Sequence, residues 1–592
     1  MSKIKIIKSK KKIIQKLVQF SLNIIKERGF NEFLNIVFSQ LEQLVIQIQE
    51  SFAVSYIKNI KKSDQYKLWL SNNDLFSNNE ELAGNLINKF NFTPSFNIIV
   101  HENNKTNFDN LISCLQKQLY KNWKIILFDL KDNNKSHIFT KPNIQKIKDF
   151  DEISNNPNFN IEYSVFIEND AILYPDTLLW IAKYLNEKKE SEIIYSDEDQ
   201  MIDDKRTNPF FKPDWSPNLF LNHDYFSKFF VIRNDLLSKI QFDKKIINHY
   251  DILLKATELT KKISHIPIPL ISIKSNDDYK SELQENMEYL KNAIQRRMIK
   301  GTLVKTNNRN FRIKYQLDKE PKVSIIIPTK DNIRVLKRCI KSLKEKTNYK
   351  NWELIIIDNN SKNKETLDYL NNLPYEVLEF NENFNFSKMN NLAVQKTNGD
   401  FLLFMNDDVA AIDPTWLHEL VSIGIQSNIG VVGPKLLFSD NTIQHAGMVF
   451  LPTGAGFHPF QRISSNGKSY HGLSNLLRDC SAVTGACLLI KKNIFDEVSG
   501  YDPDFDLYYG DSDLCLKVRE KGYDVVYTPY TKLLHDGSTK TKEISDSFFA
   551  VENHRTFIQK WQFLKNGDPF YNPNLDWNYN VETEKEITKK PF

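Results

Sequence analysis

Two adjacent carboxylates, Asp407 and Asp408, follow Asn406 directly after an apolar run, Phe401–Met405. An apolar run of this length is typical of a strand covered on both faces, as in a parallel sheet flanked by helices. The two carboxylates would then emerge at the carboxyl end of the strand, where open α/β sheets bind their ligands. The alternative is that the Asn and Asp residues simply form a turn.

The elements around these carboxylates alternate between short apolar strands and helical stretches, and from about residue 91 this alternation occurs twice. The pattern indicates an α/β fold with mostly parallel sheets. Residues 12–60 instead show helical spacing throughout, which predicts a helical N-terminal region. In the second half we expect strands at residues 323–328, 352–358, 401–405, 430–438, 485–491 and 524–529.

The two halves contain matching segments, which indicates an internal duplication. The matching pairs are residues 120–129 with 349–358, 168–176 with 406–414, and 249–258 with 511–520. Two related domains would then be joined by a polar linker. The predicted division is a helical region at 1–90, a first domain at 91–300, a linker at 301–320, a second domain at 321–572 and a tail at 573–592.

Composition limits the class of protein. A chain of 592 residues with 41% hydrophobic residues is long enough for three or more globular units. The 79 basic and 74 acidic residues leave a net charge of only +5, so nucleic acid is not an expected partner. The five cysteines show no metal-binding spacing, which favours free thiols in a reducing cytoplasm.

The start of the chain is rich in lysine, and no segment has the roughly 20 uninterrupted apolar residues that a membrane span needs. Residues 1–16 contain seven lysines, and the first acidic residue is Glu27. Such a segment could lie on an anionic membrane surface. A solvated face of an ordinary amphipathic helix explains it equally well, so we expect a cytoplasmic protein with possible peripheral membrane association.

Residues 321–572 resemble the family 2 inverting glycosyltransferases of bacterial O-antigen and polysaccharide synthesis, which have the GT-A fold. The resemblance rests on an ordered series of segments: "SIIIPTKDN", "IIIDNNS", "FNFSKMNNLAV", "NGDFLLFMNDD", "SAVTGACLLIKKNIFDEVSGYD" and "GDSDLCLKVREKGYDVVYTPYTKLLHDGS". It implies transfer of a sugar, with inversion, from a nucleotide-sugar donor to a glycan or lipid-linked saccharide acceptor.

The departure of a nucleoside diphosphate builds negative charge, which a divalent cation can neutralise. Carboxylates at a strand end suit Mg²⁺ or Mn²⁺, so Asp407 and Asp408 are the candidate ligands, with Asp408 the firmer one by the resemblance. His535 in "LLHDGS" resembles the histidine that completes the metal or diphosphate site in the family. The alternative for His535 is an ordinary surface or core histidine.

Inverting transfer also needs a base that takes the proton of the attacking acceptor hydroxyl. Asp511 is placed like the base of the family, although Gly510 stands where an acidic residue is often found. Asp513 could cap the helix that follows and is a candidate on the acceptor side. The alternative is that both aspartates are only helix caps.

The resemblance also assigns residues on the donor and acceptor sides. Candidates for holding the donor are Pro328, Thr329, Asp331, Asp358 and Asn406, the last standing where many relatives have Asp. Thr484 and Gly485 stand where the acceptor-side wall would lie, and Gly485 could alternatively serve only a close backbone approach.

The first half resembles a companion domain found in tandem with this one, and its chemistry looks degraded. His249 stands at the position of Asp511, and Ser272 or Ile273 at that of His535. Glu168, Asn169 and Asp170 keep one carboxylate of the metal motif, and the acidic run 197–199 favours a solvated loop over a cation site. We therefore expect catalysis in the second domain, with a bifunctional transferase or a non-catalytic nucleotide-sugar or glycan-binding scaffold as alternatives.

Overall fold

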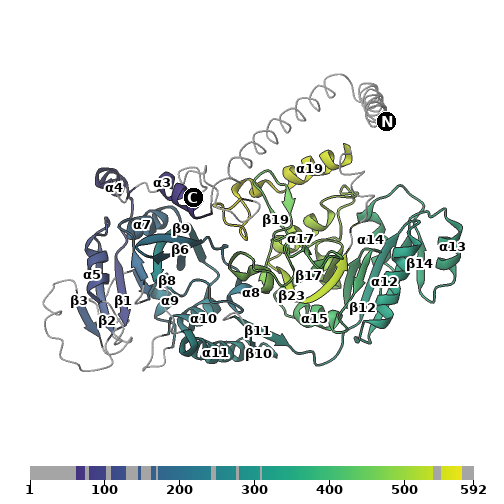
Figure 1. Ribbon diagram of the computed structural model, residues 1–592, viewed down its shortest axis with the longest axis horizontal. Coiled ribbons are helices and arrows are strands. Elements are labelled where there is room, and N and C mark those ends of the chain that lie inside the picture. Colours follow the sequence, from purple (N-terminus) through teal and green to yellow (C-terminus); the bar gives the residue numbers. More distant parts are fainter. Residues whose placement is uncertain are drawn as a thin grey trace, which may run out of the picture. The chain divides into compact units, whose positions relative to one another are not determined.

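The computed structural model (Figure 1) describes residues 62–73, 76, 79–101, 108–128, 144–147, 162–168, 171–241, 248–274, 279–306, 310–535, 537 and 548–576. The chain divides into two compact units, 1–68 and 69–592, and both large sheets belong to the second. The predicted membrane-facing segment and most of the predicted tail lie outside the described residues. Within the described part, no helix is both long and apolar enough to cross a bilayer.

The first sheet has the strand order β3-β2-β1-β4-β8-β6-β9-β5, with β7 paired to β6. Its strands are β1 (Phe96–His101), β2 (Trp123–Phe128), β3 (Ile144–Ile147), β4 (Tyr163–Ile167), β5 (Ala171–Leu173), β6 (Ile193–Ile202), β7 (Lys205–Phe210), β8 (Phe229–Arg233) and β9 (Ile263–Lys274). The helices of this half are α5 (Phe108–Gln116), α7 (Thr177–Glu187), α8 (Pro217–Phe220), α9 (Asn234–Leu237), α10 (His249–Leu259) and α11 (Tyr279–Arg296), preceded by α3 (Lys62–Asn73) and α4 (Glu80–Ile87).

The second sheet has the order β14-β13-β12-β15-β22-β17-β23-β16, with β18 paired to β17 and β21 to β23. Its strands are β12 (Val323–Thr329), β13 (Trp352–Asp358), β14 (Glu376–Glu379), β15 (Phe401–Met405), β16 (Val409–Ala411), β17 (Ile429–Leu437), β18 (Ile443–His445), β21 (Arg478–Asp479), β22 (Cys487–Lys491) and β23 (Asp524–His535). A separate small pair is formed by β19 (Val449–Phe450) and β20 (Gly456–Phe457).

The helices of the second half alternate with these strands along the chain (Figure 1). They are α12 (Ile333–Glu345), α13 (Lys364–Asn371), α14 (Phe386–Val394), α15 (Trp416–Gly424), α16 (Lys492–Glu497), α17 (Gly510–Glu520) and α19 (Phe548–Lys560), with 3₁₀ turns at Tyr470–Asn475 and Gln562–Asn566. The apolar stripe of α12, which includes Leu336, Ile340 and Leu343, is buried, as its helical spacing requires.

The two sheets have the same strand order, position by position, which is the arrangement expected from the matching sequence segments. In each sheet the first four strands are parallel neighbours. The fifth strand, β8 or β22, then runs antiparallel to both of its neighbours. The predicted α/β class is confirmed, and the sheets are mixed rather than almost entirely parallel. The exact domain boundaries stay a prediction.

Residues 301–320, expected to form a polar linker, contain an antiparallel hairpin of β10 (Gly301–Lys305) and β11 (Phe311–Tyr315). Phe311, Ile313 and Tyr315 alternate along β11 and are buried. This period of two is the pattern of a half-buried strand, and the polar residues between them obscured it in the sequence.

Candidate functional site

The carboxyl ends of β12, β13 and β15 bring several of the predicted residues to one edge of the second sheet. Thr329 and Asp358, the last residues of β12 and β13, are register partners. The Thr329 hydroxyl donates a hydrogen bond to Asp407 Oδ2 at 2.7 Å. Asp407 is half-buried and Asp408 is buried. The Asn-Asp-Asp segment therefore does form a turn between β15 and β16, and it also presents carboxylates at the sheet edge.

His535 lies beside Asp408 because β16 pairs antiparallel with β23, which places Val409 opposite His535. The distance from His535 Nε2 to Asp408 Oδ1 is 3.3 Å. His535 Nδ1 lies 3.1 Å from Gln444 Oε1, on β18. Asp408 Oδ1 is buried and has no hydrogen-bond partner of proper geometry, despite its closeness to the imidazole.

This geometry places His535 Nε2 and Asp408 Oδ1, two atoms that can both act as metal ligands, face to face. In the tautomer that carries its proton on Nδ1, the His535 ring donates to Gln444 Oε1 and its Nε2 lone pair points toward Asp408 Oδ1. A cation between the two atoms would satisfy both, and carboxylate with imidazole is a donor set that Mn²⁺ accepts. Among the residues that the structure describes, no group of three or more His, Cys, Asp and Glu side chains has the geometry to hold a metal ion.

Two further histidines lie behind this pair, and the sequence motifs did not identify them. His445 Nδ1 is 2.9 Å from His458 Nδ1, while the Gly447 N–H donates to His445 Nε2. His445 therefore carries its proton on Nδ1 and donates to His458. Burial lowers the pKa of His445 well below its usual value and that of His458 to about 4. Both rings are neutral and add no positive charge next to His535.

Asp511 lies in the first turn of α17, where it is half-buried. Its Oδ2 accepts a hydrogen bond from the Gly485 N–H at 2.7 Å, and its Oδ1 accepts one from the Ser512 N–H at 2.7 Å. Burial raises the pKa of the Asp511 carboxyl, an effect opposed by these two hydrogen bonds. A carboxylate with a raised pKa, held by backbone donors, is suited to accepting a proton.

The absence of a side chain at Gly485 allows this close contact. A Cβ atom at this position would lie 3.3 Å from Asp511 Cβ and 3.3 Å from Phe386 Cζ, tighter than most real contacts. The sequence suggested that Gly485 could serve a close approach of the backbone to another group. The structure shows this close approach, and the group is Asp511. The neighbouring Thr484 accepts the Ala486 N–H on its hydroxyl at 3.3 Å, which shapes the turn before β22.

Asp513 does not cap α17 as expected. Tyr509 occupies the N-cap position, with a left-handed φ of 66°, and no side chain caps the helix. Asp513 is fully buried, and its Oδ1 lies 3.0 Å from Trp561 Nε1 and 2.8 Å from Lys560 Nζ. The reason is helical geometry, because Asp513 stands two positions beyond Asp511 and faces the opposite, inner side of α17. It anchors the C-terminal segment.

The remaining donor-side candidates lie at the same sheet edge and differ in burial and in their hydrogen bonds. Asp358 is buried, and its Oδ1 accepts the Ser361 N–H at 3.2 Å. Asp331 has a left-handed φ of 50°, and its Oδ1 accepts the backbone N–H groups of residues 362 and 363. Pro328 is half-buried next to Thr329, and Asn406 donates its backbone N–H to the Ala486 carbonyl. The structure thus gives Asp331 a role in holding the loop after β13.

In the first half, strand register shows which residues replace the catalytic candidates. Ala171 of β5 faces Ile273 just as Val409 faces His535, so Ile273 rather than Ser272 stands at the histidine position. His249 Nδ1 lies 3.2 Å from the Ser227 carbonyl oxygen and 3.3 Å from Glu168 Oε1. The His249 ring therefore contacts the backbone of Ser227, the residue that corresponds to Gly485 of the second half. Asn169 and Asp170 lie outside the described residues.

The acidic run 197–199 is not the solvated loop that the sequence favoured. Asp197 and Asp199 are buried on β6, where Asp197 lies 2.8 Å from His265 Nε2 and Asp199 lies 2.6 Å from Arg206 Nε. Glu198 lies 2.8 Å from Lys212 Nζ. Basic partners on β7, on β9 and in the segment after β7 neutralise these carboxylates, and no pattern in the sequence indicates these pairings.

Comparison with known proteins finds a family match within the second half. Residues 324–499 match the family model "Glycosyl transferase family 2", so this region is a glycosyltransferase family 2 domain. The family resemblance found in the sequence is confirmed.

Among curated relatives, the chain is 30% identical over 509 residues to the uncharacterized protein y4gI of Sinorhizobium fredii, covering 78% of this chain and 55% of that protein. It is 32% identical over 429 residues to the O-antigen biosynthesis protein RfbC of Myxococcus xanthus, covering 69% of this chain and 33% of RfbC. The chain therefore spans about half of the first relative and a third of the second.

Among solved structures, GalNAc-T7 with UDP, GalNAc and Mn²⁺ aligns with 15% identity and a TM-score of 0.35, covering 48% of this chain and 57% of that one. The mannosyltransferase PcManGT of Pyrobaculum calidifontis, in complex with GDP-Man and Mn²⁺, aligns with 13% identity and a TM-score of 0.28, covering 41% and 70%.

Proposed function

We propose that this protein transfers a sugar, with inversion, from a nucleotide-sugar donor to a glycan or lipid-linked saccharide acceptor in cell-surface polysaccharide synthesis. The observation that carries the proposal is Asp511, a partly buried carboxylate with a raised pKa. Its partner Gly485 lies inside the family 2 match at residues 324–499, and Asp511 follows shortly after that match. The similarity to an O-antigen biosynthesis protein supports the kind of product.

Asp511 acts as the general base in this proposal. Its two oxygens are fixed by backbone N–H groups from different elements, so the carboxylate is held in one orientation. As the acceptor hydroxyl attacks the anomeric carbon, Asp511 takes its proton, and the bond from that carbon to the nucleoside diphosphate breaks. Attack on the face opposite the leaving group inverts the anomeric configuration.

Asp408 and His535 would hold a divalent cation, Mg²⁺ or Mn²⁺, because their facing atoms are 3.3 Å apart and Asp408 Oδ1 lacks a hydrogen bond. When bound, such a cation neutralises the charge that develops on the leaving diphosphate. Two protein ligands suffice if phosphate oxygens and water complete the shell, which is the usual arrangement for Mg²⁺. Asp407 is adjacent, and the Thr329 hydroxyl orients it.

The donor would bind along the edge formed by Pro328, Thr329, Asp358 and Asn406, since the carboxyl ends of parallel strands meet there. We place the chemistry in the second domain. The first domain has Ile273 and His249 at the positions of His535 and Asp511. The absence of the base and the histidine from the first domain disfavours the bifunctional alternative. The second domain keeps Asp408, Asp511 and His535, which disfavours a purely non-catalytic scaffold.

The metal assignment is tested by calorimetric titration of UDP and GDP into the full chain with Mn²⁺, with Mg²⁺ and with EDTA. We expect Asp408→Ala to abolish the metal-dependent part of diphosphate binding, because the buried oxygen that faces His535 is removed. The control is Asp413→Ala, an exposed Asp five residues along the same segment, which should bind like the wild type. Metal-dependent affinity that survives in Asp408→Ala would contradict the assignment.

A further inference from the structure

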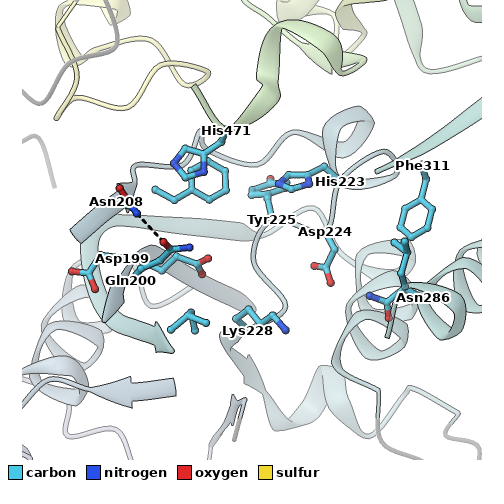
Figure 2. Close-up of a pocket in the computed structure, with 14 residues that line it drawn as sticks. Asp199, Gln200, Asn208, His223, Asp224, Tyr225, Lys228, Asn286, Phe311 and His471 are labelled. Atoms are coloured by element: carbon cyan, nitrogen blue, oxygen red, sulfur yellow. Dashed lines mark hydrogen bonds between the residues drawn. The ribbon is translucent and has the colours of Figure 1, made fainter. Parts of the chain in front are cut away.

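The first half contains a cavity of about 320 Å³ that the proposed chemistry does not use (Figure 2). Residues of β6, of the segment before β8, of α11 and of β11 line it, together with His471 from the second half.

The cavity lies beside the degenerate counterpart of the catalytic edge. Ile273 occupies the position of His535, as the register of β5 with β9 shows. Lys228 occupies that of Ala486, because its carbonyl accepts the Glu168 N–H just as the Ala486 carbonyl accepts the Asn406 N–H. The first half has thus lost the predicted base and histidine while keeping a cavity next to their positions.

The charges around the cavity largely cancel. Glu198 pairs with Lys212 at 2.8 Å and Asp199 pairs with Arg206 at 2.6 Å. Burial lowers the pKa of His223 to about 4, so its ring is neutral at physiological pH, and the pKa of His471 is also lowered although this residue lies at the exposed rim. Among the described lining residues, Lys228 is then the one cationic group. With Glu198 and Asp199 paired, Asp224 and Lys228 are the remaining charged lining residues, so the cavity has no excess of positive charge to attract a diphosphate.

What remains is a set of neutral polar groups and aromatic faces. His471 stacks on Phe210 with ring centroids 4.0 Å apart. Gln200 Oε1 accepts from Asn208 Nδ2 at 3.0 Å, and Figure 2 shows this pair across the cavity from Asn286. Amide groups can donate and accept hydrogen bonds at once, and aromatic rings pack against C–H surfaces. A sugar ring presents hydroxyls and C–H faces together.

We propose that this cavity binds a neutral saccharide unit of the acceptor glycan. The inference rests on the proposed function, since an acceptor glycan is needed only if the chain transfers a sugar. The volume is at the lower end for small-molecule sites, which suits one saccharide unit rather than a long segment. The first half would then hold the acceptor chain while its end is extended in the second half.

The test is binding of methyl glycosides of glucose, galactose, mannose, rhamnose and N-acetylglucosamine to the full chain, followed by saturation-transfer NMR without donor or metal. We expect at least one glycoside to bind at millimolar concentration. Gln200→Ala and Lys228→Ala should each weaken that binding by about fivefold or more. The matched control is Gln295→Ala, an exposed glutamine on α11 outside the cavity lining, which should bind like the wild type.

Two results would overturn the inference: no glycoside binding to the wild type, or binding that both cavity variants retain in full. Displacement of the glycoside by UDP with Mn²⁺ would also overturn it, since the sugar would then occupy the donor edge of the second half. None of these measurements depends on turnover. Failure of sugar transfer in a separate assay would refute the proposed function without changing these binding results.

Discussion

At the scale of single residues, the account depends on how Asp511 is held. Gly485 donates its N–H to the carboxylate at 2.7 Å, and a Cβ at this position would lie 3.3 Å from both Asp511 Cβ and Phe386 Cζ. The spacing of motifs identified both residues as candidates, but not their contact, because the contact joins positions 26 residues apart through tertiary packing. Similarly, Gln444 belongs to no motif, and only the pairing of β18 with β17 brings it to His535.

We predict that Gly485→Ala lowers turnover by about tenfold or more while donor affinity changes little. The added methyl group would press on Asp511 Cβ at 3.3 Å and displace the carboxylate, and small displacements of catalytic groups have large effects on rate. Steady-state kinetics with a separate titration of the donor diphosphate checks this. Turnover equal to the wild type would show that the Gly485 contact does not position the base.

At the scale of elements, α17 presents two aspartates with opposite roles. Asp511 faces the candidate site, whereas Asp513 is buried between α17 and α19, where it contacts Lys560 and Trp561. The sequence could not separate these roles, because both residues precede the same apolar helical run. The strand and helix alternation was predictable, since periodicity reports local structure. The antiparallel direction of β22 was not predictable, since its pairing with distant strands is a long-range property. The β10–β11 hairpin was missed because polar residues obscure the period of two in β11.

We predict that Asp513→Ala destabilises the protein by about 2 kcal/mol, because the indole N–H of Trp561 loses its buried acceptor. Lys560 is exposed and keeps Asp502 as a partner at 2.7 Å, so its loss of Asp513 adds little. The midpoint of thermal unfolding should fall by several degrees. The Michaelis constant for the acceptor should stay within about twofold in the folded protein. A higher Michaelis constant for the acceptor, with unchanged stability, would instead show that Asp513 contributes to acceptor binding.

At the scale of the whole molecule, the two halves within residues 69–592 share buried polar contacts. Asp479 of β21 is buried and accepts hydrogen bonds from the Ser216 hydroxyl at 2.5 Å and from Asn218 Nδ2 at 2.6 Å. Asn572 donates to Asp197 Oδ2 at 3.0 Å. No motif predicts such contacts, since each partner is unremarkable by itself. Separating the halves would leave these groups unpaired, so we expect them to be stable together.

We predict that the contribution of buried Asp479 to the free energy of unfolding falls as pH rises from about 4 to about 7. Burial, with the nearby charge of Asp524, raises the pKa of Asp479 to about 7, so the folded state binds a proton that the unfolded state releases near pH 4. The stabilisation is complete below pH 4 and lost above pH 7. Thermal unfolding between pH 5 and 8 checks this, and Asp479→Asn should flatten the dependence. An equally steep dependence in that variant would show that another group is responsible.

The central claim, that Asp511 of the second half is the catalytic base, is tested most directly by comparing two variants of the full chain at matched positions. We predict that Asp511→Asn lowers sugar transfer by roughly 100-fold or more, the scale of losing a general base, with donor affinity nearly unchanged. His249→Ala, at the corresponding position of the first half, should leave transfer within a few-fold of the wild type. If Asp511→Asn keeps transfer within a few-fold of the wild type, or if His249→Ala abolishes it, the account is wrong.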